Sequence, residues 1–524
     1  MKLNDKCLTN KAFLEQNDIK IPLFNREAIK QNTHKNPKWL HFGPGNIFRA
    51  FIASAQQSLL NEGYSDTGII AVAPNNSEII DKVYTPHDNL SLLVTMHADG
   101  SLEKKIIGSI TESLTCNPQS SADWQRLIDI CCNPKLQIIS FTITEKGYTW
   151  HDEDISSGPD NVKSFMAKIV SLLYYRYLNG AYPVTLVSMD NCSHNGEILS
   201  NSIITIASQW EQLSFVQHGF SKYLKTKITY PCTMIDKITP HPSEKVQQYL
   251  SKIGFSDMNL ISSNRGGQYA PFVNAEKTEY LVIEDIFING RPPLEKAGVI
   301  FTDRTTVDNV ERMKVCTCLN PLHTALAIYG CLLGYTLIAD EMKNPLLKKL
   351  VEKIGYEEGM PVVTNPGVLS PQKFIAECLD KRFPNPAIPD TPQRIACDTS
   401  QKIGIRFGET IKAYMQSKDL QSENLIYIPL VIAGWCRYLL GIDDKGTTFE
   451  ISPDPLLPQI QDKLGKISLG ETINVHERLI NILNDKNIFG INLYDAGIGK
   501  KIEAYFAEMI TDVNAVENTL KKYL

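Results

Sequence analysis

The segment WLHFGPGNIFRAFIASAQQSLL (residues 39–60) joins an apolar run, two close glycines and a stretch with helical periodicity. The run at 39–42 predicts a buried strand, and the residues after Gly45 predict a helix. Gly43 and Gly45 allow backbone amides at the helix N-terminus to approach a pyrophosphate, which the helix dipole would favour. Phe48 stands where the usual dinucleotide-binding pattern has its third glycine. A tight strand–helix turn without a ligand is therefore the competing interpretation.

Arg49 favours the binding interpretation. A cation in the first turn of a helix opposes the helix dipole, and a bound phosphate would compensate for it. The residues that we predict to contact a cofactor at this turn are Gly43, Gly45, Asn46, Phe48 and Arg49.

The first ~300 residues alternate short apolar runs with amphipathic stretches, which is typical of an α/β sheet covered on both faces. Strands are predicted at 39–43, 68–73, 136–144, 183–190 and 280–287. Asp99-Gly100, between alternating apolar residues, predicts a β-hairpin inserted into this domain.

Helical periodicity dominates from about residue 305 onward, and Pro292-Pro293 is a plausible linker just before it. We therefore predict an α/β domain with an inserted hairpin at 1–298 and an all-helical domain at 299–524.

The composition indicates an ordinary soluble protein. The 524 residues are 43% hydrophobic and 21% charged, and the net charge of -5 argues against binding nucleic acid or an anionic membrane through general attraction. The N-terminus MKLNDKCLTNKAFLEQ lacks the apolar run of a signal peptide, so we expect a cytoplasmic protein whose 12 cysteines are reduced. The ten histidines show no metal-binding spacing, and we predict no metal site.

Polar side chains follow two of the predicted strands. TITEKGY (142–148) places Thr144 and Glu145 at one strand end, and SMDNCSHNG (188–196) places Asn191 at another. Ligands of open α/β sheets bind at the carboxyl ends of strands, although turn formation explains either segment equally well.

In the helical part, Lys314, Asn320 and His323 interrupt the apolar helix MKVCTCLNPLHTALAIYGCLLGY (313–335). RIACDTSQK (394–402) adds Arg394 and Lys402, a pair suited to a carboxylate or to sugar hydroxyls. Local capping would explain the first group, and a solvated surface pair would explain the second.

Seven segments in order resemble the polyol-specific long-chain dehydrogenase/reductase family, over roughly residues 37–500. They are HFGPGNIFRAF (41–51), TITEKGY, SMDNCSHNG, MIDKITP (234–240), VIEDIFINGRPPLEKAGVIF (282–301), LNPLH (319–323) and RIACDTSQK. The resemblance implies a Rossmann-type N-terminal domain, a mainly α-helical C-terminal domain and metal-independent hydride transfer between a nicotinamide cofactor and a small polyol or sugar acid.

The resemblance also implies roles for single residues. Lys314 matches the family's catalytic lysine, and Asn191 and Asn320 match the amides around the reacting carbonyl. His323, Arg394 and Lys402 match substrate-positioning groups. An ordinary lysine titrates near 10.4, and burial or neighbouring cations bring such an amine into the range of a general base.

The sequences SMDNCSHNG and RFPNPAIPDTPQRIACDTSQK (382–402) resemble the hexuronate branch of the family, which implies reduction of D-fructuronate to D-mannonate. The alternatives are a mannitol 2-dehydrogenase, an epimerase that retains its NAD, and an inactive nucleotide-binding regulator. The second predicted strand ends in VAPNNSE (72–78), with Asn75 or Asn76 where an acidic residue favours NAD. NAD is expected and NADP stays an alternative, while the oligomeric state is not predicted.

One spacing departs from the family. The family lysine lies five residues before the asparagine, whereas Lys314 lies six before Asn320. At ~100° per residue, Lys314 and His323 would then point to opposite faces of a regular helix. We predict that a π-bulge within 315–319, or a non-helical segment at Lys314, absorbs the extra residue.

Overall fold

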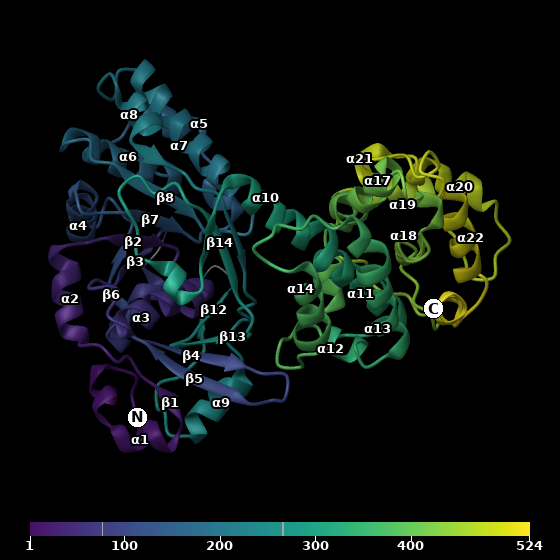
Figure 1. Cartoon of the computed structure of the whole chain (residues 1–524), viewed down its shortest axis with the longest axis horizontal. Coiled ribbons are helices and arrows are strands. Elements are labelled where there is room, and N and C mark those ends of the chain that lie inside the picture. The colour runs from purple at the N-terminus through teal and green to yellow at the C-terminus, as the bar shows by residue number, and fades with distance from the viewer. Residues whose placement is uncertain (76, 265–266) are drawn as a thin grey trace. The chain divides into compact units, whose positions relative to one another are not determined.

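The structure is a computed structural model that describes residues 1–75, 77–264 and 267–524. The chain forms two compact units (Figure 1). Unit 1 comprises Met1–His97 and Ser101–Asp308, and unit 2 comprises Ala98–Gly100 and Asn309–Leu524.

The main sheet of unit 1 has six strands, all parallel, in the order β6-β3-β2-β7-β8-β9. Their bounds are β2 Trp39–Phe42, β3 Ile69–Ala73, β6 Ile110–Thr115, β7 Ile138–Phe141, β8 Val184–Ser188 and β9 Ile228–Thr229. This is the strand order of the doubly wound dinucleotide-binding fold, whose direction of winding reverses between β2 and β7. The first four strands predicted from the sequence all lie in this sheet, and the predicted Rossmann-type fold is confirmed.

Side chains of the main sheet alternate between two cores, which explains the unbroken apolar runs. Leu40 and Phe42 pack on one face with the helical residues of 121–132, 165–178, 195–212 and 220–226. Trp39 packs on the other face with the helix that follows Gly45. Both faces are therefore covered, as parallel strands require (Figure 1).

Three smaller sheets complete unit 1. The hairpin strands β4 (Ser91–Met96) and β5 (Leu102–Ile107) pair antiparallel around Asp99-Gly100 and belong to a four-stranded sheet, β1-β5-β4-β13. The fifth predicted strand is β14 (Tyr280–Glu284), which lies in a three-stranded sheet, β10-β14-β15. The other strands are β1 Ile19–Lys20, β10 Thr233–Asp236, β11 Ile261–Ser262, β12 Gln268–Tyr269, β13 Phe272–Ala275 and β15 Ile300–Thr302.

The helical segments of unit 1 include two π-helical turns, η2 and η3. The α-helices are α1 Lys11–Gln16, α2 Arg26–Lys35, α3 Ala53–Asn61, α4 Ser121–Cys132, α5 Asp152–Ser157, α6 Phe165–Leu178, α7 Asn195–Gln212, α8 Phe220–Thr226 and α9 Glu244–Lys252. Helix α10 (Arg304–Met313) begins in unit 1 and ends in unit 2. The shorter segments are η1 Asp5–Thr9, η2 Phe48–Ile52, η3 Ile80–Tyr84, η4 Thr85–His87, η5 Glu145–Tyr148 and η6 Leu294–Ala297.

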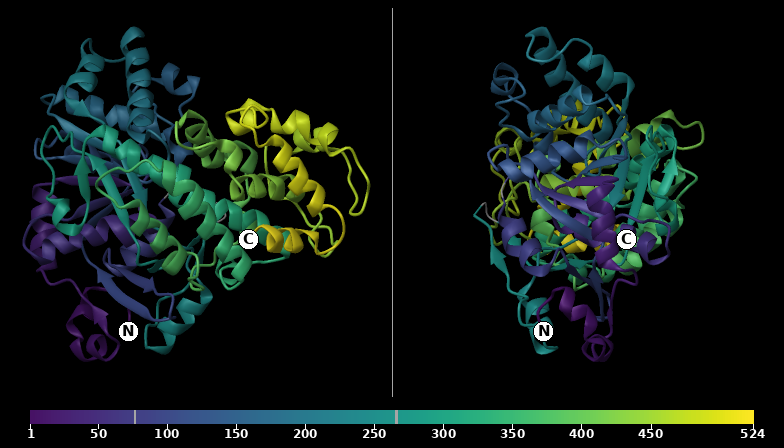
Figure 2. Two further views of the ribbon diagram at one scale, coloured as in Figure 1. Left: turned by 45° about the vertical axis from the view of Figure 1, so that its right-hand side comes forward. Right: turned by 90° about the vertical axis from the view of Figure 1, so that its left-hand side faces the viewer.

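Unit 2 is built from helices (Figure 2), and the sequence predicted this. Its α-helices are α11 Asn320–Leu333, α12 Ile338–Glu341, α13 Pro345–Glu352, α14 Pro371–Glu377, α15 Pro392–Ile395, α16 Thr399–Ile403, α17 Glu409–Gln416, α18 Tyr427–Tyr438, α19 Leu457–Leu464, α20 Val475–Leu483, α21 Lys486–Phe489, α22 Gly499–Met509 and α23 Ala515–Tyr523. The π-helical turns are η7 Lys314–Cys318, η8 Lys353–Gly359, η10 Cys378–Arg382 and η11 Gly404–Gly408, and the 3-10 turns are η9 Met360–Val362 and η12 Ser422–Asn424.

The helix Arg304–Leu333 is long and apolar enough to cross a membrane by length and composition alone. Its most apolar window is 83% buried inside the protein, so packing accounts for its apolar character. The 12 cysteines are free thiols in the structure, and nine of them are buried.

Buried carboxylates fix two helix N-termini of unit 2 from distant positions in the chain. Glu358 accepts hydrogen bonds from the backbone N–H groups of Tyr427 and Ile428 at 2.8 and 2.7 Å, at the start of α18. Asp444 likewise accepts from Val516 and Glu517 at the start of α23. Each carboxylate satisfies amides that a helix leaves without partners.

Glu341, in α12, is a buried carboxyl group of a different kind. Its side chain is fully buried, and neither carboxyl oxygen has a hydrogen-bond partner among the described residues. It lies against Gly330 so closely that a Cβ there would come within 2.0 Å of Glu341 Oε1. Burial, followed by the negative charge of Asp390, raises the pKa of Glu341 to about 9.

This carboxyl group should make unit 2 less stable as the pH rises. The unfolded carboxyl ionises near pH 4.3, whereas the folded one keeps its proton up to about pH 9, so unfolding releases a proton throughout this window. The resulting loss is at most roughly 1.4 kcal/mol per pH unit. Glu341→Gln has a side chain of the same shape that does not titrate. The melting temperature of this variant should therefore rise relative to that of the wild type as the pH increases from 6 to 9.

Glu357→Gln is the matched control, because Glu357 is half-exposed and paired with Lys353. Its melting curve should follow that of the wild type at each pH. Parallel pH profiles for the wild type and Glu341→Gln would contradict the prediction.

Candidate active site

The turn after β2 requires a glycine at its first position. Gly43 has φ +102°, and a Cβ there would lie 2.0 Å from the carbonyl oxygen of Thr142. Thr142 Oγ1 donates to the Gly43 carbonyl at 2.7 Å, and the Tyr84 hydroxyl donates to the Pro44 carbonyl at 2.9 Å. The turn is therefore held from two sides.

The second glycine of the turn differs from the first. A Cβ at Gly45 would meet no atom within 4 Å. Its carbonyl accepts the first helical hydrogen bond, from Arg49 N at 3.2 Å. The backbone at the helix N-terminus is therefore accessible at Gly45, as the binding interpretation of the sequence requires.

Phe48 replaces the third glycine by packing inward. Its ring is fully buried and stacks on His41, with the ring centroids 4.1 Å apart and the planes 8° apart. His41 contacts Ser140 Oγ at 2.7 Å and Thr142 Oγ1 at 2.9 Å, and burial lowers its pKa to about 3. A neutral imidazole thus lies under the turn. Phe48 shapes the turn from inside, and its predicted contact with a cofactor stays a prediction.

Arg49 also has a different environment from the one expected. Its side chain is fully buried, donates to the Ala270 carbonyl at 2.7 Å and donates to Asn46 Oδ1 at 2.9 Å. These acceptors offset its unfavourable position near the helix N-terminus. Arg49 therefore fixes the orientation of Asn46, and its predicted contact with a cofactor stays a prediction.

The ends of β7 and β8 are joined by Asp190. Its carboxylate accepts from the backbone N–H groups of Ile143 at 2.9 Å and Thr144 at 2.8 Å, and from the Tyr148 hydroxyl at 2.6 Å. Thr144 is held at φ +65°, ψ 161°, a conformation that a β-branched residue adopts only under constraint. Thr144 and Glu145, both predicted cofactor contacts, are exposed beside this clamp.

Asn191 follows Asp190 directly and is exposed. The nearby Asn195 is fully buried, and its amide exchanges hydrogen bonds with Thr233, which ties the start of α7 to β10. The predicted unit 1 residues thus gather at the carboxyl ends of β2, β7 and β8.

The end of β3 carries the cofactor-selecting position. Asn75 is exposed there, and Asn76 lies outside the described residues. The next acidic side chain, Glu78, is buried and paired with Lys82 at 2.6 Å, and it also accepts from Ser263.

In unit 2 the predicted π-bulge is confirmed. Lys314–Cys318 forms the π-helical turn η7, and Leu319 N donates to the Lys314 carbonyl, five residues earlier, at 3.1 Å. Pro321 explains why the π-helical turn lies directly before α11. A proline has no N–H to donate to the preceding turn, and its ring crowds the carbonyl four residues earlier. The Thr410 hydroxyl donates to the Cys316 carbonyl at 3.2 Å, inside the widened turn.

The π-turn brings the side chains of Lys314 and His323 towards the same side of the helix. Absorbing one residue reduces nine helical steps between Lys314 and His323 to the equivalent of eight, so the two side chains differ by about 80° rather than 180°. Lys314 is 4% exposed. Asn320, His323 and Thr324 are three and four residues apart and therefore share one face of α11.

His323 and Arg394 meet through Asp390, which the sequence did not single out. His323 Nε2 lies 2.9 Å from Asp390 Oδ2, and Arg394 Nε donates to Asp390 Oδ1 at 3.1 Å. Burial alone would raise the pKa of Asp390, but the hydrogen bond from His323 and the charges of His323 and Arg394 outweigh it and lower that pKa. The spacing of Asp390 and Arg394, four residues apart, was the available signal.

Lys402 and Arg406 extend this region. Lys402 Nζ donates to the Cys397 carbonyl at 2.9 Å and lies 3.5 Å from Asp398. Arg406, which was not predicted, donates to Thr324 Oγ1 at 2.6 Å, and Thr324 Oγ1 in turn donates to the Asn320 carbonyl at 2.8 Å.

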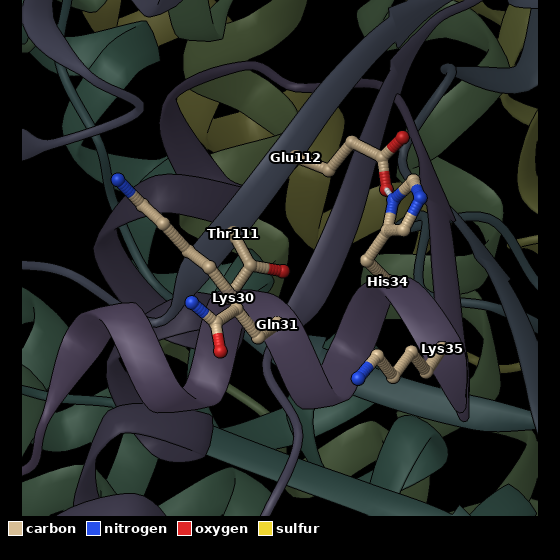
Figure 3. Close-up of a pocket in the computed structure, with 6 residues that line it drawn as sticks. All are labelled: Lys30, Gln31, His34, Lys35, Thr111 and Glu112. Carbon is tan, nitrogen blue, oxygen red and sulfur yellow. Dashed lines mark ion pairs between the residues drawn. The ribbon is translucent and has the colours of Figure 1, made fainter.

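A pocket of about 450 Å³ lies elsewhere in unit 1, between α2 and β6 (Figure 3). Its lining residues are Lys30, Gln31, His34, Lys35, Thr111 and Glu112, and none of them was predicted as a site residue. Within 1–75, 77–264 and 267–524, no three His, Cys, Asp or Glu side chains are grouped so that they would hold a metal ion.

Two family domains match the chain in order. Residues 37–296 match the mannitol dehydrogenase Rossmann domain, and residues 306–510 match the mannitol dehydrogenase C-terminal domain. The chain belongs to the mannitol dehydrogenase family. The resemblance seen in the seven sequence segments is thereby confirmed.

Individual family members differ in their similarity. The D-mannonate oxidoreductase of Thermotoga maritima is 50% identical over 534 aligned residues, which cover 100% of this chain and 99% of the relative. The D-mannonate oxidoreductase of Escherichia coli is 29% identical over 440 residues, which cover 80% of this chain and 84% of the relative. The structure of Pseudomonas fluorescens mannitol 2-dehydrogenase, in a ternary complex with NAD and D-mannitol, is 26% identical with a TM-score of 0.71, covering 100% and 99%.

Gly43→Ala should destabilise this member of the mannitol dehydrogenase family by about 1–3 kcal/mol, because the methyl group meets the Thr142 carbonyl in a left-handed conformation. Gly45→Ala is the matched control, and its free energy of unfolding should remain close to that of the wild type. Denaturant titration measures both. Equal losses in the two variants would contradict the account of the turn.

Thr410→Val should cost about 1 kcal/mol of unfolding free energy, since it leaves the Cys316 carbonyl without its hydroxyl donor. Thr410→Ser, which keeps the donor, should retain most of that stability in the same titration. A serine variant as unstable as the valine variant would show that packing, not the hydrogen bond, supports the π-turn.

Proposed function

We propose that this chain is a D-mannonate oxidoreductase, which reduces D-fructuronate to D-mannonate with NADH and catalyses the reverse oxidation. The observation that carries the proposal is the 50% identity to the Thermotoga maritima D-mannonate oxidoreductase over the full length of both chains. The mannitol 2-dehydrogenase of known structure is more distant, at 26% identity. D-Mannitol is therefore a comparison substrate rather than a second proposal.

NAD is the proposed cofactor. The family's Rossmann domain and the NAD complex of the Pseudomonas fluorescens relative support it. The accessible backbone at Gly45 and the strand reversal between β2 and β7 fit a pyrophosphate at the helix N-terminus. Gly43, Gly45 and Asn46 would hold the phosphates, with Arg49 fixing Asn46, and Thr144 and Glu145 would flank them. Once bound, the nicotinamide donates or accepts the hydride.

Lys314 is proposed as the acid and base. In the reducing direction its ammonium group gives a proton to the oxygen of the reacting carbonyl as the hydride arrives at carbon. In the oxidising direction the amine removes the hydroxyl proton. The amides of Asn191 and Asn320 would donate hydrogen bonds to the same oxygen, where negative charge develops. Burial of Lys314 limits proton exchange with bulk water.

His323, Arg394 and Lys402 are proposed to position the substrate. Asp390 holds the imidazole of His323 through one ring nitrogen and leaves the other for a substrate hydroxyl. The side chain of Arg394 is 65% exposed while anchored on Asp390, so its guanidinium is both oriented and accessible. The cytoplasmic location expected from the sequence stays a prediction.

The test is a set of steady-state rates, followed at 340 nm with NADH, on D-fructuronate, D-tagaturonate and D-fructose. We expect the highest kcat/KM with D-fructuronate. A faster reaction with D-fructose would replace the proposal by a mannitol 2-dehydrogenase. Product formed without net change in NADH would indicate an epimerase.

Lys314→Met should lower kcat by about 10²–10⁴-fold, the usual contribution of a general acid or base, with NADH affinity unchanged. Lys343→Met is the matched control, because Lys343 is exposed and paired with Asp340, and its rates should equal those of the wild type. An unchanged kcat for Lys314→Met would contradict the role of Lys314 and favour a nucleotide-binding regulator.

A further inference from the structure

Three buried arginines of this protein, Arg26, Arg176 and Arg437, each donate to several acceptors. Arg176 donates to the carbonyls of Asn133, Tyr182 and Pro183, among others. Arg437 donates to three carbonyls, and Arg26 has Asp5 and several carbonyls as partners. This is the normal state of a guanidinium removed from water, because an unpaired charge there is costly.

Arg406 departs from this pattern. It is partly buried, and Thr324 Oγ1 is its one hydrogen-bond partner in the part of the chain that the structure describes. Burial lowers the pKa of Arg406 to about 10, and no acidic group among the described residues offsets that effect. A guanidinium has five N–H donors, so most of its donor capacity is available to a ligand.

The surroundings of Arg406 hold it in place. It lies in the π-helical turn η11, whose Gly404 and Gly408 pack on the backbone of α21. A Cβ at Gly404 would lie 2.6 Å from the Ile488 carbonyl, and a Cβ at Gly408 would lie 2.0 Å from the Phe489 carbonyl. This contact fixes the backbone on both sides of Arg406.

Arg406 also lies beside the proposed reaction site. Its hydrogen bond to Thr324 continues to the Asn320 carbonyl, and the buried Thr324 shares one face of α11 with Asn320 and His323. The two other cations predicted to position the substrate have acidic neighbours, since Arg394 is paired with Asp390 and Lys402 lies 3.5 Å from Asp398. Within the described residues, Arg406 has no carboxylate partner.

We propose that Arg406 binds the carboxylate of the sugar-acid substrate and determines the preference of the enzyme for sugar acids over neutral polyols. The inference rests on the proposed function and deepens it. D-Mannonate and D-mannitol differ in one terminal group, a carboxylate in place of a hydroxymethyl group. A carboxylate gives the guanidinium a charged, bidentate partner, whereas a hydroxymethyl group leaves its charge uncompensated. Discrimination follows from both effects.

The experiment compares Arg406→Met and Arg406→Lys with the wild type on D-mannonate and D-mannitol, with NAD. Arg406→Met should lower kcat/KM for D-mannonate by roughly 100-fold, mainly through KM, because a ground-state contact is removed. The rate with D-mannitol should change less than about threefold. Arg406→Lys should recover part of the loss, since it keeps the charge without the planar fork.

The matched control is Arg312→Met. Arg312 is half-exposed and already paired with Glu409, so its loss should leave the ratio of the two kcat/KM values unchanged. Equal losses on both substrates in Arg406→Met would assign Arg406 a structural role and overturn the proposal. Unchanged kinetics on both substrates would also overturn it.

Direct binding decides the matter when D-mannitol reacts too slowly to measure. Calorimetric titration of D-mannonate into the NADH complex should show roughly 100-fold weaker binding in Arg406→Met, while NADH affinity stays constant. Unchanged D-mannonate affinity would overturn the proposal. Failure of the proposed function would give a different result, because the wild type itself would then have a higher kcat/KM with D-mannitol or D-fructose than with the sugar acid.

Discussion

A single backbone hydrogen bond, from Leu319 N to the carbonyl of Lys314, is the constraint on which the second unit's chemistry depends. It closes a turn one residue wider than an α-helical turn and thereby absorbs the extra residue between Lys314 and Asn320. Without it, the amine and the imidazole of His323 would leave the helix on opposite sides. The proline at 321 and the hydroxyl of Thr410 are the two groups that make the wide turn acceptable.

The sequence predicted the architecture well because the relevant signals are local. Apolar runs located β2, β3, β7 and β8, and the lysine spacing located the π-turn. The sequence did not separate β14 from the main sheet, because an apolar run does not reveal its pairing partner. It also did not reveal that Arg49 donates to the Ala270 carbonyl, because that acceptor is 221 residues away in the chain.

The functional groups missed by the sequence are those that act through long-range contacts. Asp390 was hidden in a proline-rich loop, and only the fold shows that it orients both His323 and Arg394. Arg406 was not singled out, because a sequence does not record which charges lack partners. The roles of Lys314, Asn191 and Asn320 stay predictions that rest on family resemblance and on the geometry within each unit.

The contact between η11 and α21 has a consequence for how specificity is encoded. The groups that press on Gly404 and Gly408 are the carbonyl oxygens of Ile488 and Phe489, which every amino acid carries. Side-chain changes at 488 and 489 that preserve the backbone therefore leave the guanidinium where it is, whereas even one methyl group at 404 or 408 displaces it. Substitution of either glycine would therefore change the preference between sugar acid and polyol, although neither glycine would touch the sugar.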